Sequence, residues 1–145
     1  MKKKINIGNL DLGFLTEKKI QTKLIEKDFL TLEPIIESGT IDLLSYKNNI
    51  FKRLQCKTAV YNRSEDRFSC PLIRTGHQKY DLNEIDFFAI YIHEIEIVYF
   101  IPSNKKILGG QSLKFYPHRK KRFDRKIYID YENFRENFNL LEKKI

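Results

Sequence analysis

Short apolar runs separated by polar turns dominate the chain and predict a β-rich protein that begins with a helix. The first helix is expected over residues 15–28, with Thr16 as its N-cap. Strands should follow at residues 29–36, 40–46, 50–60 and 67–73. The Asn48-Asn49 pair predicts a two-residue hairpin turn, which would place the second and third strands side by side.

The second half of the chain continues the pattern with less helix between the strands. We expect a short helical or turn segment at 81–86, and strands at 87–92, 95–101, 112–116 and 126–129. Phe134, Phe138 and Leu141 share one stripe of a predicted final helix over 130–141. This order favours an α/β (α+β) fold, with a central mixed β-sheet flanked by helices. We expect residues 1–145 to form a single domain, with a basic C-terminal extension from about residue 103.

Composition is that of a globular protein, since 41% of the 145 residues are hydrophobic and 32% are charged. No apolar run is long enough to span a membrane. The basic start at residues 1–6 is not followed by an apolar stretch, so we expect no signal peptide and a cytoplasmic location. Cys56 and Cys70 fall on predicted core strands, which suits reduced thiols, although a bridge between them remains open.

The net charge of +8 indicates a polyanionic partner, because such a field attracts polyanions. An AT-rich genome could inflate the lysine count, but it does not explain the clustering of basic residues with aromatics near residues 114–126. A solvated loop is the alternative, and the global charge favours a DNA or RNA surface. A second polar loop follows the fourth predicted strand and could also contact DNA or be solvated. The candidate DNA-binding residues are Arg74, His77, Lys79, Lys114, His118, Arg119, Lys120, Lys121 and Arg122.

A cation site is expected where the second and third predicted strands meet. Asp42 lies within an apolar run, where an unpaired carboxylate would be costly. Gln55 and Lys57 are two residues apart, so their side chains leave a strand on the same face. Glu17 shares the apolar stripe of the first helix and should face the sheet. Alternatively, Glu17 only decorates the first helical turn, where the helix dipole favours an acid.

The order of a helix-borne Glu17, Thr40-Ile41-Asp42 and Gln55-Cys56-Lys57 resembles the core signature of the PD-(D/E)XK nuclease superfamily. The chain is most similar to the small branch related to group I intron homing endonucleases, in which Gln replaces the usual acid. Two later blocks also look like that branch, namely YDLNEIDFFAIY at 80–91 and VYFIP at 98–102. The resemblance covers about residues 15–102 and implies a restriction-endonuclease-like core.

The resemblance implies a metal-dependent endonuclease with Glu17, Asp42, Gln55 and Lys57 as catalytic residues. Asp42 would be the central Mg²⁺ ligand, with the Cys56 backbone carbonyl as a second ligand and Mn²⁺ as a substitute ion. Glu17 would bind the metal through water or hold Lys57, and Lys57 would orient the attacking water. Because Gln55 brings no negative charge, a second tightly held metal is doubtful.

Double-stranded DNA is the implied substrate, cut to leave 5′-phosphates by a site-specific homing-type enzyme. One active site per chain cuts one strand at a time, so we expect a homodimer or homotetramer. The alternatives are a nuclease similar to Holliday junction resolvases or restriction enzymes, and a catalytically silent DNA-binding module. His77, His93 and His118 are scattered along the chain and lack the spacing of zinc ligands relative to the cysteines.

Overall fold

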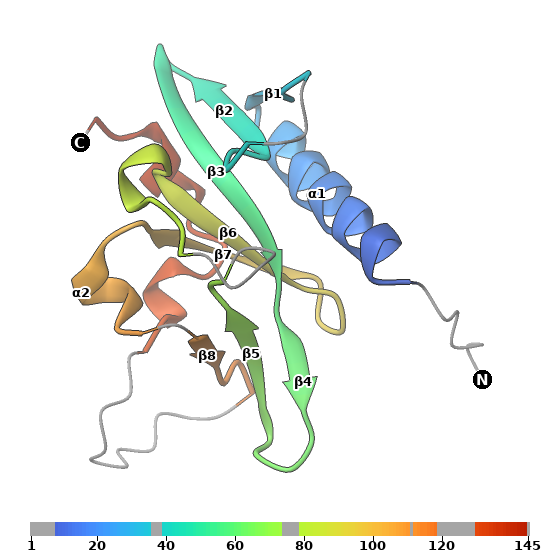
Figure 1. The fold of residues 1–145 in the computed structure, drawn as a ribbon. Helices are drawn as coiled ribbons and strands as arrows, with labels where there is room; N and C mark the ends of the chain where they lie inside the picture. Colours follow the sequence, from blue (N-terminus) through green and yellow to red (C-terminus); the bar gives the residue numbers. More distant parts are fainter. Residues whose placement is uncertain (1–7, 36–38, 74–78, 111, 119–129, 145) are drawn as a thin grey trace.

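The computed structural model describes residues 8–35, 39–73, 79–110, 112–118 and 130–144 (Figure 1). A five-stranded mixed sheet forms its centre in the order β1-β2-β3-β6-β7. Only β3 and β6 are parallel, and the other neighbours are antiparallel. The bounds of these strands are Leu30–Leu32 (β1), Leu43–Lys47 (β2), Ile50–Thr58 (β3), Phe87–Ile92 (β6) and Ile97–Pro102 (β7).

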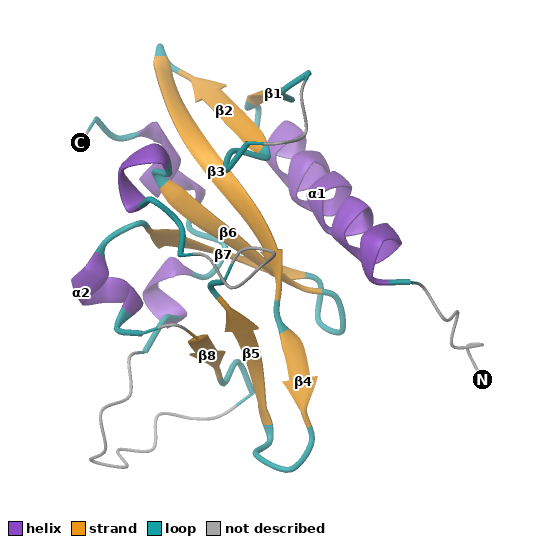
Figure 2. Ribbon diagram, viewed as in Figure 1, coloured by secondary structure: helices purple, strands orange, loops and turns teal. Residues whose placement is uncertain are grey.

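Helix α1 (Asn9–Glu26) runs alongside β3 and covers one face of the central sheet (Figure 2). Thr16, Ile20 and Leu24 recur every four residues and are buried, which is the periodicity of a helix with one face on a core. The chain leaves the helix through Asp28, whose φ of 65° lies in the left-handed region that Asp tolerates. Within the described residues, no helix is long and apolar enough to cross a membrane.

The predicted hairpin between the second and third strands is confirmed. Lys47 pairs with Ile50, and the intervening Asn48 and Asn49 have φ values of 53° and 64°. Both angles are positive, as a two-residue hairpin turn matching the twist of its strands requires. The turn therefore sets the register that brings Asp42 close to the middle of β3.

A second sheet of three antiparallel strands, in the order β4-β5-β8, follows from the end of β3. Its strands are Val60–Asn62 (β4), Arg67–Pro71 (β5) and Ser112–Phe115 (β8). Side chains of β5 and β8 share a core with Phe88, Ile90 and Ile92 of β6. Residues on the opposite face of β6 pack with α1. Strand β6 is buried along its whole length because both faces are covered.

Short helical segments complete the structure. They are η1 (Leu82–Glu84), α2 (Lys105–Leu108), η2 (Glu132–Phe134) and η3 (Phe138–Glu142). The strand expected at 126–129 lies outside the described residues.

Two sequence-based predictions about helices are wrong. The first helix begins at Asn9 rather than near residue 15, so Thr16 is a buried residue of its interior and not its N-cap. The final helix expected over 130–141 is instead two separate 3-10 turns. Its apolar residues do not serve one face: Phe134 packs on the core beneath the second sheet, whereas Phe138 and Leu141 pack with α1. The two cysteines are free and buried, as expected for reduced thiols.

Candidate active site

Asp42 directly precedes β2, at the end of this strand where the chain leaves β3. Its backbone N–H donates to the Leu54 carbonyl at 2.9 Å, and its Oδ2 accepts the Cys56 N–H at 2.9 Å. The chain that precedes β2 leaves β3 here and, within the described residues, offers no backbone carbonyl to the Cys56 N–H. The Asp42 carboxylate accepts this hydrogen bond instead. Burial raises the pKa of Asp42, although the Cys56 hydrogen bond and the charge of Lys57 oppose this increase.

The backbone of Cys56 adds a second oxygen on the same side of β3. In an extended strand, the N–H and C=O of one residue point to the same neighbour. Because the Cys56 N–H donates to Asp42, the Cys56 carbonyl also leaves β3 on the side of Asp42. Along a strand, the backbone groups of successive residues point to alternate sides. The N–H and C=O groups of Gln55 and Lys57 therefore point toward β6.

The side chains of Gln55 and Lys57 share one face of β3, as the sequence spacing predicts. Lys57 Nζ donates to the Ile73 carbonyl at 3.3 Å and lies 5.0 Å from the centre of the Tyr80 ring. Gln55 is only 8% exposed, and its Oε1 is buried without a hydrogen-bond partner among the described residues. A buried carbonyl oxygen without a donor is costly unless a cation or a donor fills the position.

Glu17 lies on α1, which packs on the face of the sheet that carries the Cys56 side chain, opposite to the face of Gln55 and Lys57. Burial raises the pKa of the Cys56 thiol well above its usual range, and the charges of Asp42 and Glu17 raise it further. The thiol therefore remains protonated and packs in the α1 core. Its backbone, not its sulfur, is the group available for chemistry. The charges of both carboxylates thus act on the same residue of β3, although they come from different elements.

The donor set fits a hard divalent cation. Within the described residues, no cluster of three or more His, Cys, Asp or Glu side chains is arranged to hold a metal. Mg²⁺, however, usually retains several waters and takes only one or two carboxylates from the protein. The Asp42 carboxylate, the Cys56 carbonyl and the unsatisfied Gln55 Oε1 are all oxygen donors of the kind that Mg²⁺ prefers.

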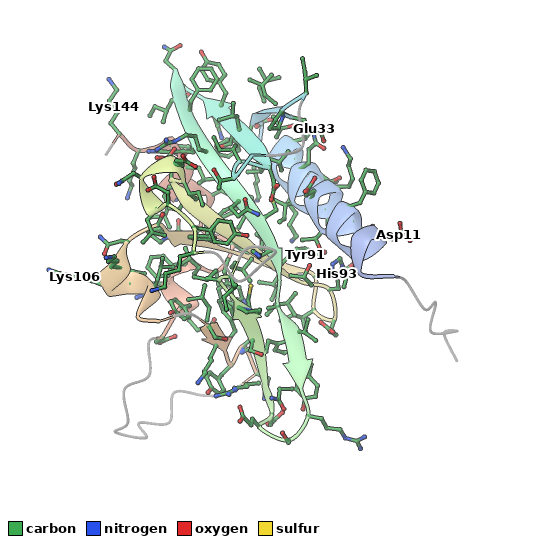
Figure 3. The ribbon with its side chains drawn as sticks, in the orientation of Figure 1. Asp11, Glu33, Tyr91, His93, Lys106 and Lys144 are labelled. Atoms are coloured by element: carbon green, nitrogen blue, oxygen red, sulfur yellow. The ribbon has the colours of Figure 1, made fainter. Side chains whose placement is uncertain are left out.

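A polar network that no sequence pattern indicated connects α1 to the end of β3. Thr16 Oγ1 lies 2.5 Å from Thr58 Oγ1 and 2.7 Å from His93 Nε2. Figure 3 shows His93 beside Tyr91, near the N-terminal half of α1. Because Thr16 adjoins Glu17 and Thr58 adjoins Lys57, this network fixes the backbone next to two candidate catalytic residues. Its members are far apart in the sequence, so no local pattern could have found it.

Two further contacts hold the strands around the site. Arg53 donates to Asp86 from its backbone N–H at 2.7 Å and from Nε and Nη2 at 3.1 and 3.0 Å. Burial by itself would raise the pKa of Asp86, but the hydrogen bonds and charge of Arg53 lower it below its ordinary value. Thr40, two residues before Asp42, donates its hydroxyl to Glu84 at 2.6 Å.

The structure describes only some of the candidate DNA-binding residues. Lys79 is exposed and forms an isolated β-bridge with Ile73, the residue whose carbonyl accepts from Lys57. Lys114 is exposed on β8. His118 is also exposed, and its Nε2 lies 3.2 Å from Asp66 Oδ2. The others lie outside the described residues: Arg74, His77, Arg119, Lys120, Lys121 and Arg122.

The fold agrees with comparisons to known proteins. Residues 9–134 match the model of a family described as PD-(D/E)XK endonuclease. The chain therefore belongs to the PD-(D/E)XK endonuclease family, which places it among the nucleases. The resemblance predicted from the sequence is confirmed. Comparison with curated protein sequences gave no match.

A solved structure shares the fold over most of both chains. It is described as a bacterial homing endonuclease, I-Ssp6803I, and superposes with a TM-score of 0.75 at 17% sequence identity. The match covers 92% of this chain and 90% of the other. At this identity the likeness establishes the fold, and it confirms the predicted restriction-endonuclease-like core with a mixed sheet.

Proposed function

We propose that this protein is a Mg²⁺-dependent DNA endonuclease that hydrolyses phosphodiester bonds and leaves 5′-phosphates. The observation that carries the proposal is the bond from the Cys56 N–H to the Asp42 carboxylate, one residue along β3 from Gln55, whose buried Oε1 has no hydrogen-bond partner among the described residues. Asp42 bonded to Cys56, and Gln55 and Lys57 on β3, supply oxygen donors and an ammonium group from neighbouring positions in a chain that belongs to a family of nucleases. Mn²⁺ is the expected substitute, because it also favours carboxylate and carbonyl oxygen.

Each residue has a distinct role in this proposal. A divalent cation bound by Asp42, Gln55 and the Cys56 carbonyl would polarise the phosphate and lower the pKa of a bound water. Glu17 would hold water molecules on the α1 side of the site. Lys57 would donate hydrogen bonds to the attacking water or to a phosphate oxygen, and so stabilise negative charge as the transition state forms.

We further propose site-specific, homing-type cleavage by a homodimer or homotetramer. The structural neighbour that shares this fold is described as a homing endonuclease, which favours this role over a resolvase-like or restriction-like one. One active site per chain cuts a single strand, so a duplex cut needs at least two chains. The exposed Lys79, Lys114 and His118 are proposed to contact the DNA backbone, together with the basic residues outside the described ranges.

The test is metal-dependent nicking of a mixed supercoiled and linear DNA library, read by sequencing the ends. Wild-type protein should cut in Mg²⁺, whereas Asp42→Ala and Lys57→Ala should not. Both variants should still bind DNA, because the basic surface supplies the affinity. Lys106→Ala, at an exposed lysine of α2, is the matched control and should cut normally.

Other outcomes would point elsewhere. Equal absence of cutting in wild type and variants, with DNA binding retained, favours a catalytically silent DNA-binding module. Preferential cutting of a four-way junction favours a resolvase-like enzyme. Loss of both cutting and binding in Lys57→Ala would mean that Lys57 is structural.

A further inference from the structure

The ammonium group of Lys57 contacts two groups that lie outside β3. One is the Ile73 carbonyl, 3.3 Å from Nζ, and the other is the face of the Tyr80 ring, whose centre is 5.0 Å from Nζ. Neither group carries a charge. The ammonium has three N–H donors, so one bond to Ile73 leaves two for water or phosphate.

Ile73 and Tyr80 are brought together by the chain itself. Ile73 forms an isolated antiparallel bridge with Lys79, the residue before Tyr80. Both contacts of Lys57 therefore come from residues at or next to this bridge. A shift of either side of this bridge would move the carbonyl and the ring relative to Nζ.

Tyr80 is itself braced against the core. Its ring packs edge-on against Phe88 of β6, with the ring centres 5.5 Å apart and the planes at 73°. Phe88 is fully buried and is the register partner of Gln55 in the parallel pair of β3 and β6. The ring beneath Lys57 is thus fixed by the same strand that borders the candidate site.

We propose that Tyr80 is a positioning residue for Lys57 in phosphodiester cleavage. The negative face of the ring attracts the ammonium and limits the many rotamers of a long side chain, while the Ile73 carbonyl orients one N–H. The remaining donors then point consistently toward the reacting phosphate. This inference rests on the proposed catalytic role of Lys57.

The test varies the electrostatics of the ring and keeps its shape. Phenylalanine and its 4-fluoro, 3,5-difluoro and 3,4,5-trifluoro derivatives are incorporated at position 80, since each added fluorine weakens the negative face. Single-turnover nicking of supercoiled DNA in Mg²⁺ is measured for each. Tyr80→Phe should cut nearly as fast as wild type, and the rate should fall stepwise with fluorination, by about 2- to 30-fold over the series.

Two controls separate positioning from structure. The same series at Phe51, an aromatic residue of β3 that is 55% exposed, should not change the rate. DNA binding and melting temperature should be equal across the Tyr80 series. Tyr80→Leu, which keeps an apolar side chain but removes the ring, should cut more slowly than Tyr80→Phe.

The outcomes distinguish this inference from the function on which it rests. A flat response to fluorination, with Lys57→Ala inactive, would overturn the role of Tyr80 and leave the nuclease proposal intact. Normal cutting by Lys57→Ala would overturn the catalytic role of Lys57 itself. A stepwise loss together with an inactive Lys57→Ala would support both.

Discussion

The carboxylate of Asp42 accepts the backbone N–H of Cys56 on the neighbouring strand, 2.9 Å away. One bond therefore orients the proposed metal ligand and satisfies a donor that the separation of β2 from β3 would leave unpaired. The same arrangement buries a negative charge, which is costly until a cation binds. Several predictions about stability and activity depend on this balance and on the contacts around it.

Asp42→Asn should abolish cutting and raise the melting temperature at neutral pH. An amide oxygen can still accept the Cys56 N–H, but it carries no charge to desolvate. Because burial raises the pKa of Asp42 above 3.8, its favourable contribution is complete at low pH and is lost as pH rises through the folded pKa. The advantage of the Asn variant, measured by thermal denaturation without metal, should therefore grow from pH 4 to pH 8.

The matched control for that experiment is Asp11→Asn, an exposed acid in the first turn of α1 (Figure 3). It should not gain stability in this way. A lower melting temperature for Asp42→Asn at pH 8 would contradict the idea that burial of the Asp42 charge opposes folding.

Gln55→Glu should retain some cutting, with an altered preference between Mg²⁺ and Mn²⁺. The buried Gln55 Oε1 has no partner among the described residues, so a carboxylate there would add charge where a cation is expected. Without metal, the new buried charge should lower the melting temperature, and added Mn²⁺ should restore more stability than in wild type. Gln21→Glu on α1 is the control. Equal stabilisation of both proteins by metal would place the cation elsewhere.

Asp86→Asn should destabilise the protein by about 1.5–3 kcal/mol at neutral pH, because three hydrogen bonds from Arg53 lose a charged acceptor. Since the folded pKa of Asp86 is lowered, its contribution is present above the ordinary value of 3.8 and is lost as pH falls through the folded pKa. Urea denaturation should therefore show the gap to wild type closing in acid. A gap independent of pH would mean that the charge of Asp86 contributes nothing.

Thr16→Val should cost about 1–3 kcal/mol and slow cutting, because Thr58 and His93 both lose their shared partner. The substitution preserves shape, so packing of α1 should survive. Thr22→Val is the control on the same helix, where the exposed hydroxyl donates to the Lys18 carbonyl. Its effect should stay within about 0.5 kcal/mol in urea denaturation. Equal effects of Thr16→Val and Thr22→Val would contradict a stabilising role of the hydrogen bonds among Thr16, Thr58 and His93.

Apolar runs along the sequence predicted strands of this fold correctly, whereas amphipathic spacing alone did not predict the final helix. Strand β6 appears at the predicted residues, because an apolar run of this length between polar segments suits a buried strand. The predicted final helix failed because amphipathic spacing was its only evidence. In the structure Phe134 and Phe138 serve different cores, and the backbone between them departs from a helix to reach both.

The candidate site also has features that local sequence patterns predict and contacts that they do not predict. The shared face of Gln55 and Lys57 on β3 and the turn at Asn48-Asn49 could be predicted from the sequence alone, since strand alternation and left-handed turn residues are local properties. The groups that contact Lys57 and Thr16 became known from the folded structure and could not be predicted from local patterns. Tyr80 and His93 reach them from distant positions in the chain, and such contacts follow from how the strands and the helix pack.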